Sequence, residues 1–414
     1  MEQKIKYQYS YFIYPYIIDE KKYSQYMLKL LKDEHCKLKI WEKERDLNLY
    51  TYFLPEARDY LFWSFSYNEE KRKKLEELDA EWKAKLLEKY ACTTFEYTLP
   101  EDVQGKIGEE NGIFFTIPTM NIVCFNTGVC FLLIKTIVEQ ENKFSDVLNF
   151  NYKFRDINSE FVSLKNYENI RLQTNSFKDI KELSDLIKKI TGPDRDAKEM
   201  NIADERFLTY SYVCLDQSNW KKEEDFKNLQ EGFVKFSNIL PSSNQVNYSD
   251  EWYEKQVISP LKFTKIGFTK QGTVLLTSSS NTENYTKLPF AYEQEYLYTY
   301  LIALYKKIYL NKINLELKTT NSFEQTRSKF LEFTRNIWIQ EITADDEGSL
   351  LYEKWKNTLE IEYLYSEIKN KFDIEYKDLN IEKNRKTNLI IIAALVGTLA
   401  FNIINFIMMF LKNK

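Results

Sequence analysis

The chain has 414 residues, 29% of them charged, with a formal net charge of −4 and a mean hydropathy of −0.50. Such a slightly acidic chain lacks the bulk basic surface that duplex nucleic acid requires, so we expect no direct binding to nucleic acid. Five cysteines and one histidine, without any CxxC pair, form no zinc-ligand pattern and suit reduced thiols in the cytoplasm.

The first 287 residues mix strand and helix patterns. Tyr, Phe and Ile alternate at the start of segment 6–53, which predicts a strand there. Segment 67–90 predicts one amphipathic helix whose apolar stripe is formed by Leu75, Leu78, Trp82, Leu86 and Leu87. Further strands are predicted over 93–99, 112–138, 207–215 and 263–277, and further helices over 144–157, 177–190 and 223–240.

Turn signals divide the predicted strands. Pro118 and the tripeptide 126–128 (Asn-Thr-Gly) interrupt segment 112–138, and the tripeptide 270–272 (Lys-Gln-Gly) centres a second hairpin. Segment 191–196 is a break. This mixture of hairpins and helices predicts an α+β fold with a largely antiparallel sheet.

The character of the sequence changes at Leu288-Pro289. The next 97 residues, 290–386, contain no proline and a single glycine, and they predict three helices over 292–318, 322–341 and 350–386. Apolar residues follow a spacing of three and four along the third helix, from Leu351 through Trp355 and Phe372 to Leu379. Such a stripe packs within one chain or against a second copy, and the spacing fits both equally.

Segment 387–411 predicts a membrane span. Its 25 residues carry no charge, Lys383, Arg385 and Lys386 precede it, and Lys412 and Lys414 follow it. A helix of about 20 apolar residues crosses the hydrocarbon of a bilayer, which is roughly 30 Å thick. A buried core helix is the alternative, but such helices are usually shorter and carry a polar face.

The predicted organisation is therefore a sensor domain over 1–287, a helical stalk over 288–386 and a transmembrane helix over 387–411. The polar N-terminus resembles no signal peptide, and basic residues precede the span. We expect a single-pass protein of the inner (cytoplasmic) membrane, with the bulk of the chain in the cytoplasm.

Polar residues share one side of the predicted span. Ala394, Thr398, Asn402 and Asn405 fall within an arc of about 80° at ~100° per residue. Gly397 forms a small-residue pair with Ala393 beside this arc. Because an asparagine in hydrocarbon is costly without a hydrogen-bond partner, the arc predicts a pore lining or a helix–helix interface rather than a simple anchor.

Two positions in the body are candidates for ligand binding. Arg155 and Asp156 end one apolar run, and Asp216 ends another. Arginine suits phosphate and aspartate suits an amine or a ribose hydroxyl, although a structural salt bridge or a helix cap explains each residue equally well. Catalytic motifs are missing, and His35 reads as a surface histidine on an exposed helix, so we expect no enzyme.

The sequence resembles the CorA-like metal ion transporter superfamily, and in particular the CorA-type membrane proteins associated with type III CRISPR systems. The matching stretches are 131–157 (FLLIKTIVEQENKFSDVLNFNYKFRDI), 291–310 (AYEQEYLYTYLIALYKKIYL) and 328–372, followed by the terminal apolar segment. The resemblance implies a cytoplasmic sensor domain on a helical stalk, assembled as a homo-oligomer around a pore.

The resemblance further implies gating by a nucleotide second messenger, adenylated S-adenosylmethionine (SAM-AMP), which leads to damage of the membrane of infected cells. Arg155, Asp156 and Asp216 are the residues we assign to that ligand, on their chemistry and rough position. The alternatives are a CorA-like divalent cation channel and a tail-anchored scaffold without a pore. The chain has one span and lacks the Gly-Met-Asn tripeptide that recognises hydrated magnesium, so magnesium transport fits the sequence poorly.

Overall fold

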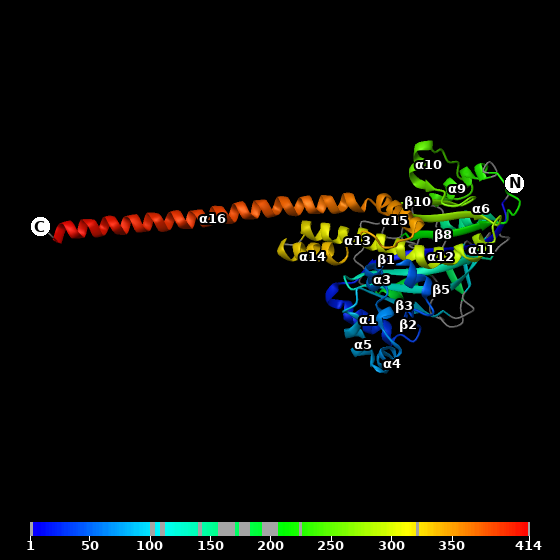
Figure 1. The fold of residues 1–414 in the computed structure, drawn as a ribbon, viewed down its shortest axis with the longest axis horizontal. Helices are drawn as coiled ribbons and strands as arrows, with labels where there is room; N and C mark the ends of the chain where they lie inside the picture. Colours follow the sequence, from blue (N-terminus) through cyan, green and yellow to red (C-terminus); the bar gives the residue numbers. More distant parts are fainter. Residues whose placement is uncertain are drawn as a thin grey trace.

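The computed structural model of the chain describes residues 3–99, 104–107, 112–139, 143–155, 170–173, 183–192, 206–222, 226–319 and 323–412. It shows a body built around one β-sheet, from which a single long helix projects to the C-terminus (Figure 1). The sheet is mixed and mostly antiparallel, and helices cover both of its faces. The predicted α+β class is confirmed at this level.

The strands are β1 (Ile5–Ile17), β2 (Cys36–Leu38), β3 (Cys92–Tyr97), β4 (Gln104–Ile107), β5 (Ile113–Phe125), β6 (Val129–Val138), β7 (Ile170–Gln173), β8 (Leu208–Leu215), β9 (Val257–Ile258), β10 (Lys265–Thr269) and β11 (Gly272–Ser278). Their order is β2-β3-β5-β6-β1-β8-β11-β10-β9, with β4 pairing β5 and β7. Within the described residues only β8 and β11 run parallel.

The helices of the N-terminal half are α1 (Tyr23–Lys32), α2 (Leu47–Tyr52), α3 (Pro55–Leu61), α4 (Glu69–Glu77), α5 (Ala80–Leu87), α6 (Phe144–Phe154) and α7 (Leu183–Thr191), with short 3-10 turns η1 (Glu20–Lys22) and η2 (Trp63–Ser66). The later helices are α9 (Gln230–Ser237), α10 (Asp250–Gln256), α11 (Glu283–Thr286), α12 (Leu288–Ala291), the π-helical turn η4 (Tyr292–Tyr296), α13 (Leu297–Thr319), α14 (Phe323–Asn336), α15 (Asp346–Thr358) and α16 (Ile361–Lys412).

The central strand β1 is buried on both faces because helices cover each side of it. Phe12 and Tyr14 point into one core with α1, α6 and α9, whereas Tyr9 and Tyr11 point into the other core with α13 and α15. The alternation of side chains along a strand thus divides one aromatic-rich segment between two hydrophobic layers.

Sheet tyrosines hold the start of α13 in place. The Tyr9 hydroxyl donates to the Pro289 carbonyl at 2.6 Å, and the Tyr210 hydroxyl donates to the Tyr292 carbonyl at 2.7 Å. These hydroxyls join β1 and β8 to the segment that leads into α13, and at Pro289 the hydroxyl adds to the bond that the Tyr292 amide donates. The buried helix α13 is consequently fixed to the sheet rather than standing apart from it.

Several predicted elements are confirmed, with the strand over 5–17, the two hairpins and β8 among them. Pro118 does not end β5, because the strand passes it with a shift in register between Thr116 and Thr119. The helix over 223–240 is shorter than predicted, and residues 177–182 and 223–225 lie outside the described residues.

The prediction of a single helix over 67–90 is wrong. The chain breaks at Leu78, and the Asp79 side chain accepts from the Trp82 amide at 2.8 Å to start α5. Leu75 and Leu87 are buried as expected, but Trp82 is 61% exposed, so the stripe does not form one face. The aspartate cap stabilises the start of a new helix. This stabilisation outweighs the tendency of the surrounding residues to continue one helix through Leu78.

His35 does not lie on a helix either. It follows α1 in the turn that leads into β2, where its amide donates to Asp33 Oδ1 at 2.9 Å and its carbonyl accepts from the Thr98 amide. Its side chain is 28% exposed. The histidine therefore belongs to the join between α1 and the sheet.

The helix predicted over 350–386 is interrupted as well. Helix α15 ends at Thr358, α16 begins at Ile361, and Glu360 between them has a φ of 55°. A side chain other than glycine is unfavourable in this left-handed region by roughly 1–2 kcal/mol. The elbow at Leu359-Glu360 is thus a strained joint at the base of the longest helix.

We expect Glu360→Gly to be more stable than Glu360→Ala by about 1 kcal/mol, because glycine adopts a positive φ without steric cost. Both variants lose the carboxylate, so their difference isolates the backbone conformation. Chemical denaturation of the full chain in detergent measures it. Equal unfolding free energies would show that the elbow is unstrained.

Candidate functional site

Helix α16 is the most prominent candidate for a functional element. At ~1.5 Å per residue its 52 residues extend roughly 78 Å, and the described residues from 373 to 411 are all exposed. Leu389, Val396, Phe401 and Met409 are 57–73% exposed. In the part of the chain that the structure describes, α16 is the one helix long and apolar enough to cross a membrane.

The polar residues predicted to line a pore or an interface all lie on this exposed helix. Thr398 Oγ1 donates to the Ala394 carbonyl at 2.8 Å, which satisfies the hydroxyl within its own helix. Asn402 and Asn405 are exposed, and a side chain at Gly397 would meet nothing within 4 Å. No described residue of the body covers this side of α16.

The structure does not bring Arg155 and Asp216 together. Arg155 follows α6 and its carbonyl accepts from the Phe207 amide at 2.8 Å, just before β8, whereas Asp216 follows the far end of β8. Nine residues of extended chain span roughly 30 Å. Asp216 is exposed, and Asp156 lies outside the described residues. One small ligand therefore contacts one of these ends and not both.

Arg155 instead connects to the turn between β10 and β11. Its side chain is 8% exposed and its Nη1 donates to Gln271 Oε1. The neighbouring turn residue, Lys270, forms an ion pair with Glu360 at 2.8 Å. The turn therefore links the end of α6 to the strained elbow at the base of α16.

A buried contact holds the same hairpin to α15. Trp355 Nε1 donates to Thr273 Oγ1 at 2.8 Å, and its ring lies edge-on to Phe268 with 5.8 Å between the centroids. Gly272 permits the close approach of β11 to β8, because a Cβ there would lie 1.9 Å from the Thr209 carbonyl oxygen. Sequence patterns gave no signal for this link, since Trp355 and Thr273 are 82 residues apart in the chain.

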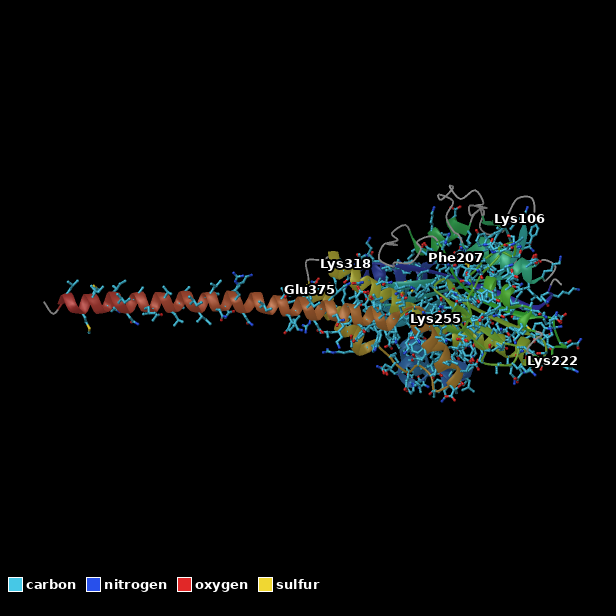
Figure 2. The ribbon with its side chains drawn as sticks, turned by 90° about the horizontal axis from the view of Figure 1, so that it is seen from above. Lys106, Phe207, Lys222, Lys255, Lys318 and Glu375 are labelled. Atoms are coloured by element: carbon cyan, nitrogen blue, oxygen red, sulfur yellow. The ribbon has the colours of Figure 1, made fainter. Side chains whose placement is uncertain are left out.

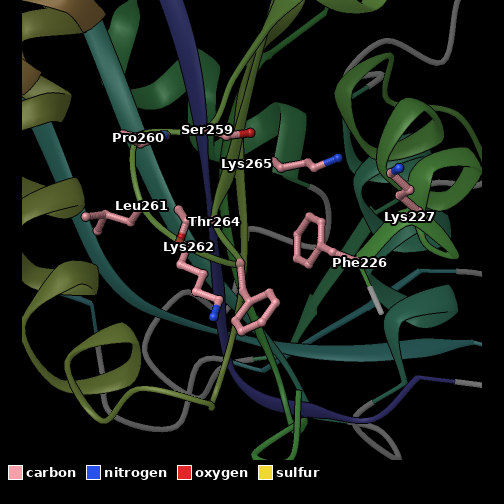
Figure 3. A pocket seen from close by; sticks show the side chains of 9 residues that line it. Phe226, Lys227, Ser259, Pro260, Leu261, Lys262, Thr264 and Lys265 are labelled. Carbon is pink, nitrogen blue, oxygen red and sulfur yellow. The ribbon is translucent and has the colours of Figure 1, made fainter. Parts of the chain in front are cut away.

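A pocket of about 510 Å³ opens at the other end of β10. Figure 3 shows its lining, which includes three lysines, Lys227, Lys262 and Lys265, and the ring of Phe226. Lys265 Nζ lies 5.0 Å from the centroid of that ring. None of the nine lining residues is acidic, so the pocket has the character to hold an anionic group beside an aromatic surface. No motif in the sequence indicated this pocket.

Lys306 is the most deeply buried cation with a large pKa shift among the described residues. It is 2% exposed, and its Nζ donates to the Tyr352 hydroxyl at 2.6 Å and to the Ile339 carbonyl. Burial, with a smaller contribution from the Lys356 ammonium, lowers the pKa of Lys306 to about 7. The lysine joins α13 to α15, directly before the elbow.

The described residues contain no group of three or more His, Cys, Asp or Glu side chains that could hold a metal ion. All five cysteines are buried and unpaired by disulfides, and burial raises the pKa of Cys36 and of Cys214 to about 12. Comparison of the chain with family models, curated proteins and solved structures finds no match.

We expect the stability of the protein to rise with pH above about 7 in a manner that depends on Lys306. The unfolded chain binds a proton up to a pKa of about 10.4, whereas the folded chain releases it at about 7. The unfolded state thus holds more protons between these values, which favours folding as pH rises, by up to ~1.4 kcal/mol per pH unit.

The measurement compares the unfolding free energy of the wild type with that of Lys306→Met from pH 6.5 to 9. Groups other than Lys306 titrate in both proteins, so subtracting one unfolding free energy from the other at each pH removes their contribution. The wild type should gain stability relative to the variant across this range, and parallel curves would contradict the assignment.

Proposed function

We propose that this protein is a ligand-gated membrane effector of antiviral defence, in which several copies assemble through α16 and compromise the bilayer when a nucleotide second messenger binds the body. The observation that carries the proposal is the exposure of the apolar side of α16. A water-soluble protein buries such a surface, whereas a bilayer solvates it.

The membrane placement is supported by the length and flanks of the apolar segment. At ~1.5 Å per residue its 25 residues extend about 37 Å, enough to cross the hydrocarbon. Arg385 and Lys386 precede it, which favours a cytoplasmic location for the body at the inner membrane.

Assembly of several copies is supported by the polar residues inside that segment. Asn402 and Asn405 are exposed, and each amide requires a partner in hydrocarbon. The same residue on a neighbouring copy, or water in a pore between copies, supplies one. Gly397 and Ala393 allow close approach of two helices on an adjacent side.

The resemblance of segments 131–157, 291–310 and 328–372 to CorA-type proteins of type III CRISPR systems supports a nucleotide such as SAM-AMP as the messenger. Arg155 suits its phosphate and already contacts the turn that pairs with Glu360. A phosphate that competes for the guanidinium releases Gln271, which loosens the hold of the turn on the elbow. The ligand thereby favours one position of α16 over another.

In liposomes we expect SAM-AMP to raise dye efflux through the full-length protein by roughly tenfold, the scale of a typical allosteric coupling. The double variant Asn402→Leu, Asn405→Leu should reduce that efflux several-fold because it removes the polar lining. The matched control, Ile403→Leu with Ile404→Leu, keeps the segment apolar and should leave efflux unchanged. Efflux that does not depend on the ligand would end this proposal and favour a constitutive channel. The absence of any efflux would favour a scaffold, whose body would work on any anchor.

Two further variants separate binding from transmission. Arg155→Ala should lose both ligand binding, measured by calorimetry, and the efflux response. Gln271→Ala should keep the ligand site while raising efflux without ligand toward the liganded level, because it removes the contact that the ligand displaces. If Arg155→Ala responds normally and Lys262→Ala with Lys265→Ala does not, the ligand occupies the lysine pocket instead.

A further inference from the structure

We propose that α16 packs in parallel against α16 of a second copy through a heptad seam that begins at Ile374, in water, and continues into the apolar segment. This inference rests on the proposed assembly of several copies and specifies the residues through which they meet.

The seam follows from the spacing of residues along α16. Steps of seven lead from Ile374 through Ile381, Asn388, Leu395 and Asn402 to Met409. A second series lies three residues later and runs from Lys377 through Asn384, Ile391 and Thr398 to Asn405. Alternating steps of three and four keep both series on one side of a helix that supercoils to the left around a partner.

The aqueous part of this seam is uncovered in the single chain. Ile374 and Ile381 are 61% and 65% exposed, although both precede the apolar segment. Figure 2 shows the helix leaving the body near Glu375, after which no other element accompanies it. Isoleucines repeated every seven residues on a helix in water are typical of a surface that a partner helix covers.

The body does not compete for this side of the helix. The buried side chains of α16 that pack on the body are Ile361, Leu364, Ile368 and Phe372, which are 0%, 6%, 0% and 5% exposed. In the frame of the seam, with Ile374 and Lys377 at positions a and d, these four fall at positions b, e, b and f. Body and second copy thus occupy different sides of one helix, and both contacts form together.

The chemistry of the seam favours a copy of this chain over an unrelated partner. Lys377 lies within the seam and Asp378 flanks it, so in a parallel pair each lysine faces the aspartate of the neighbouring helix. Asparagine is its own hydrogen-bond complement, which lets Asn388, Asn402 and Asn405 each pair with the same residue across the axis. A shared membrane orientation makes the two helices parallel.

The seam also gives the polar residues of the apolar segment a common role. Thr398, Asn402 and Asn405 are three consecutive seam positions, in the same two series as the isoleucines outside the membrane. Gly397 falls at position c, off the seam, and is left for contact with lipid or with a further copy. One continuous interface therefore joins the stalk to the span.

Cysteine cross-linking of the full chain in detergent or liposomes tests the seam. Ile381→Cys should form a disulfide-linked dimer under mild oxidation, whereas Leu379→Cys, two residues away and also exposed at 47%, should not. Background is low because all five native cysteines are buried. Equal cross-linking of both variants, or cross-linking of Leu379→Cys alone, would overturn the proposal.

A charge swap supplies the second measurement. Lys377→Glu should reduce cross-linking of Ile381→Cys several-fold, and adding Asp378→Lys should restore it, a rescue that general aggregation would not show. Cross-linking is measured independently of efflux. If the seam cross-links but efflux does not depend on the ligand, the proposed function is wrong and the seam stands. If the protein is a monodisperse monomer in liposomes, with lipid alone around the helix, the proposal of the seam is wrong.

Discussion

The surface of α16 beyond residue 373 is the constraint on which the rest of the molecule depends. Large apolar side chains occur on every side of it, and none of its described residues from 373 to 411 is covered by the body. Burial of such surface contributes about 25 cal/mol per Å², so lipid and partner helices have a large advantage over water. The body therefore carries a helix whose favourable surroundings are lipid or partner helices rather than the body itself.

Contacts within the body hold α13 firmly in place. Tyrosines of the sheet bind carbonyls before α13, and the Lys135–Glu293 ion pair at 2.7 Å ties the same segment to β6. Lys312, 5% exposed, pairs with Glu20 across the opposite end of α13. Against this rigid base the elbow at Glu360 stands out, since it combines an unfavourable φ with a largely exposed ion pair.

Local patterns in the sequence predicted the elements whose structure is decided locally. Alternation identified β1 and β8, and glycine turns identified both hairpins. The breaks at Leu78 and Leu359-Glu360 escaped prediction because neither contains glycine or proline, and each is stabilised by a cap or by a contact from another element. The same distinction applies to the candidate site. The shared side of the polar residues of α16 follows from helical spacing, which is local. The separation of Arg155 from Asp216 depends instead on the length of β8.

The composition of the seam bears on how α16 switches. A seam of isoleucine and leucine alone would hold copies together permanently, but Lys377, Asn388, Asn402 and Asn405 interrupt it, and polar residues at seam positions reduce stability while fixing register. A ligand shifts two arrangements only by its difference in affinity for them, and about 5.5 kcal/mol converts a 1:99 mixture into 99:1. A weakened seam brings the arrangements within that range. The polar residues thus serve twice, since they align the copies and keep the assembly responsive to the body.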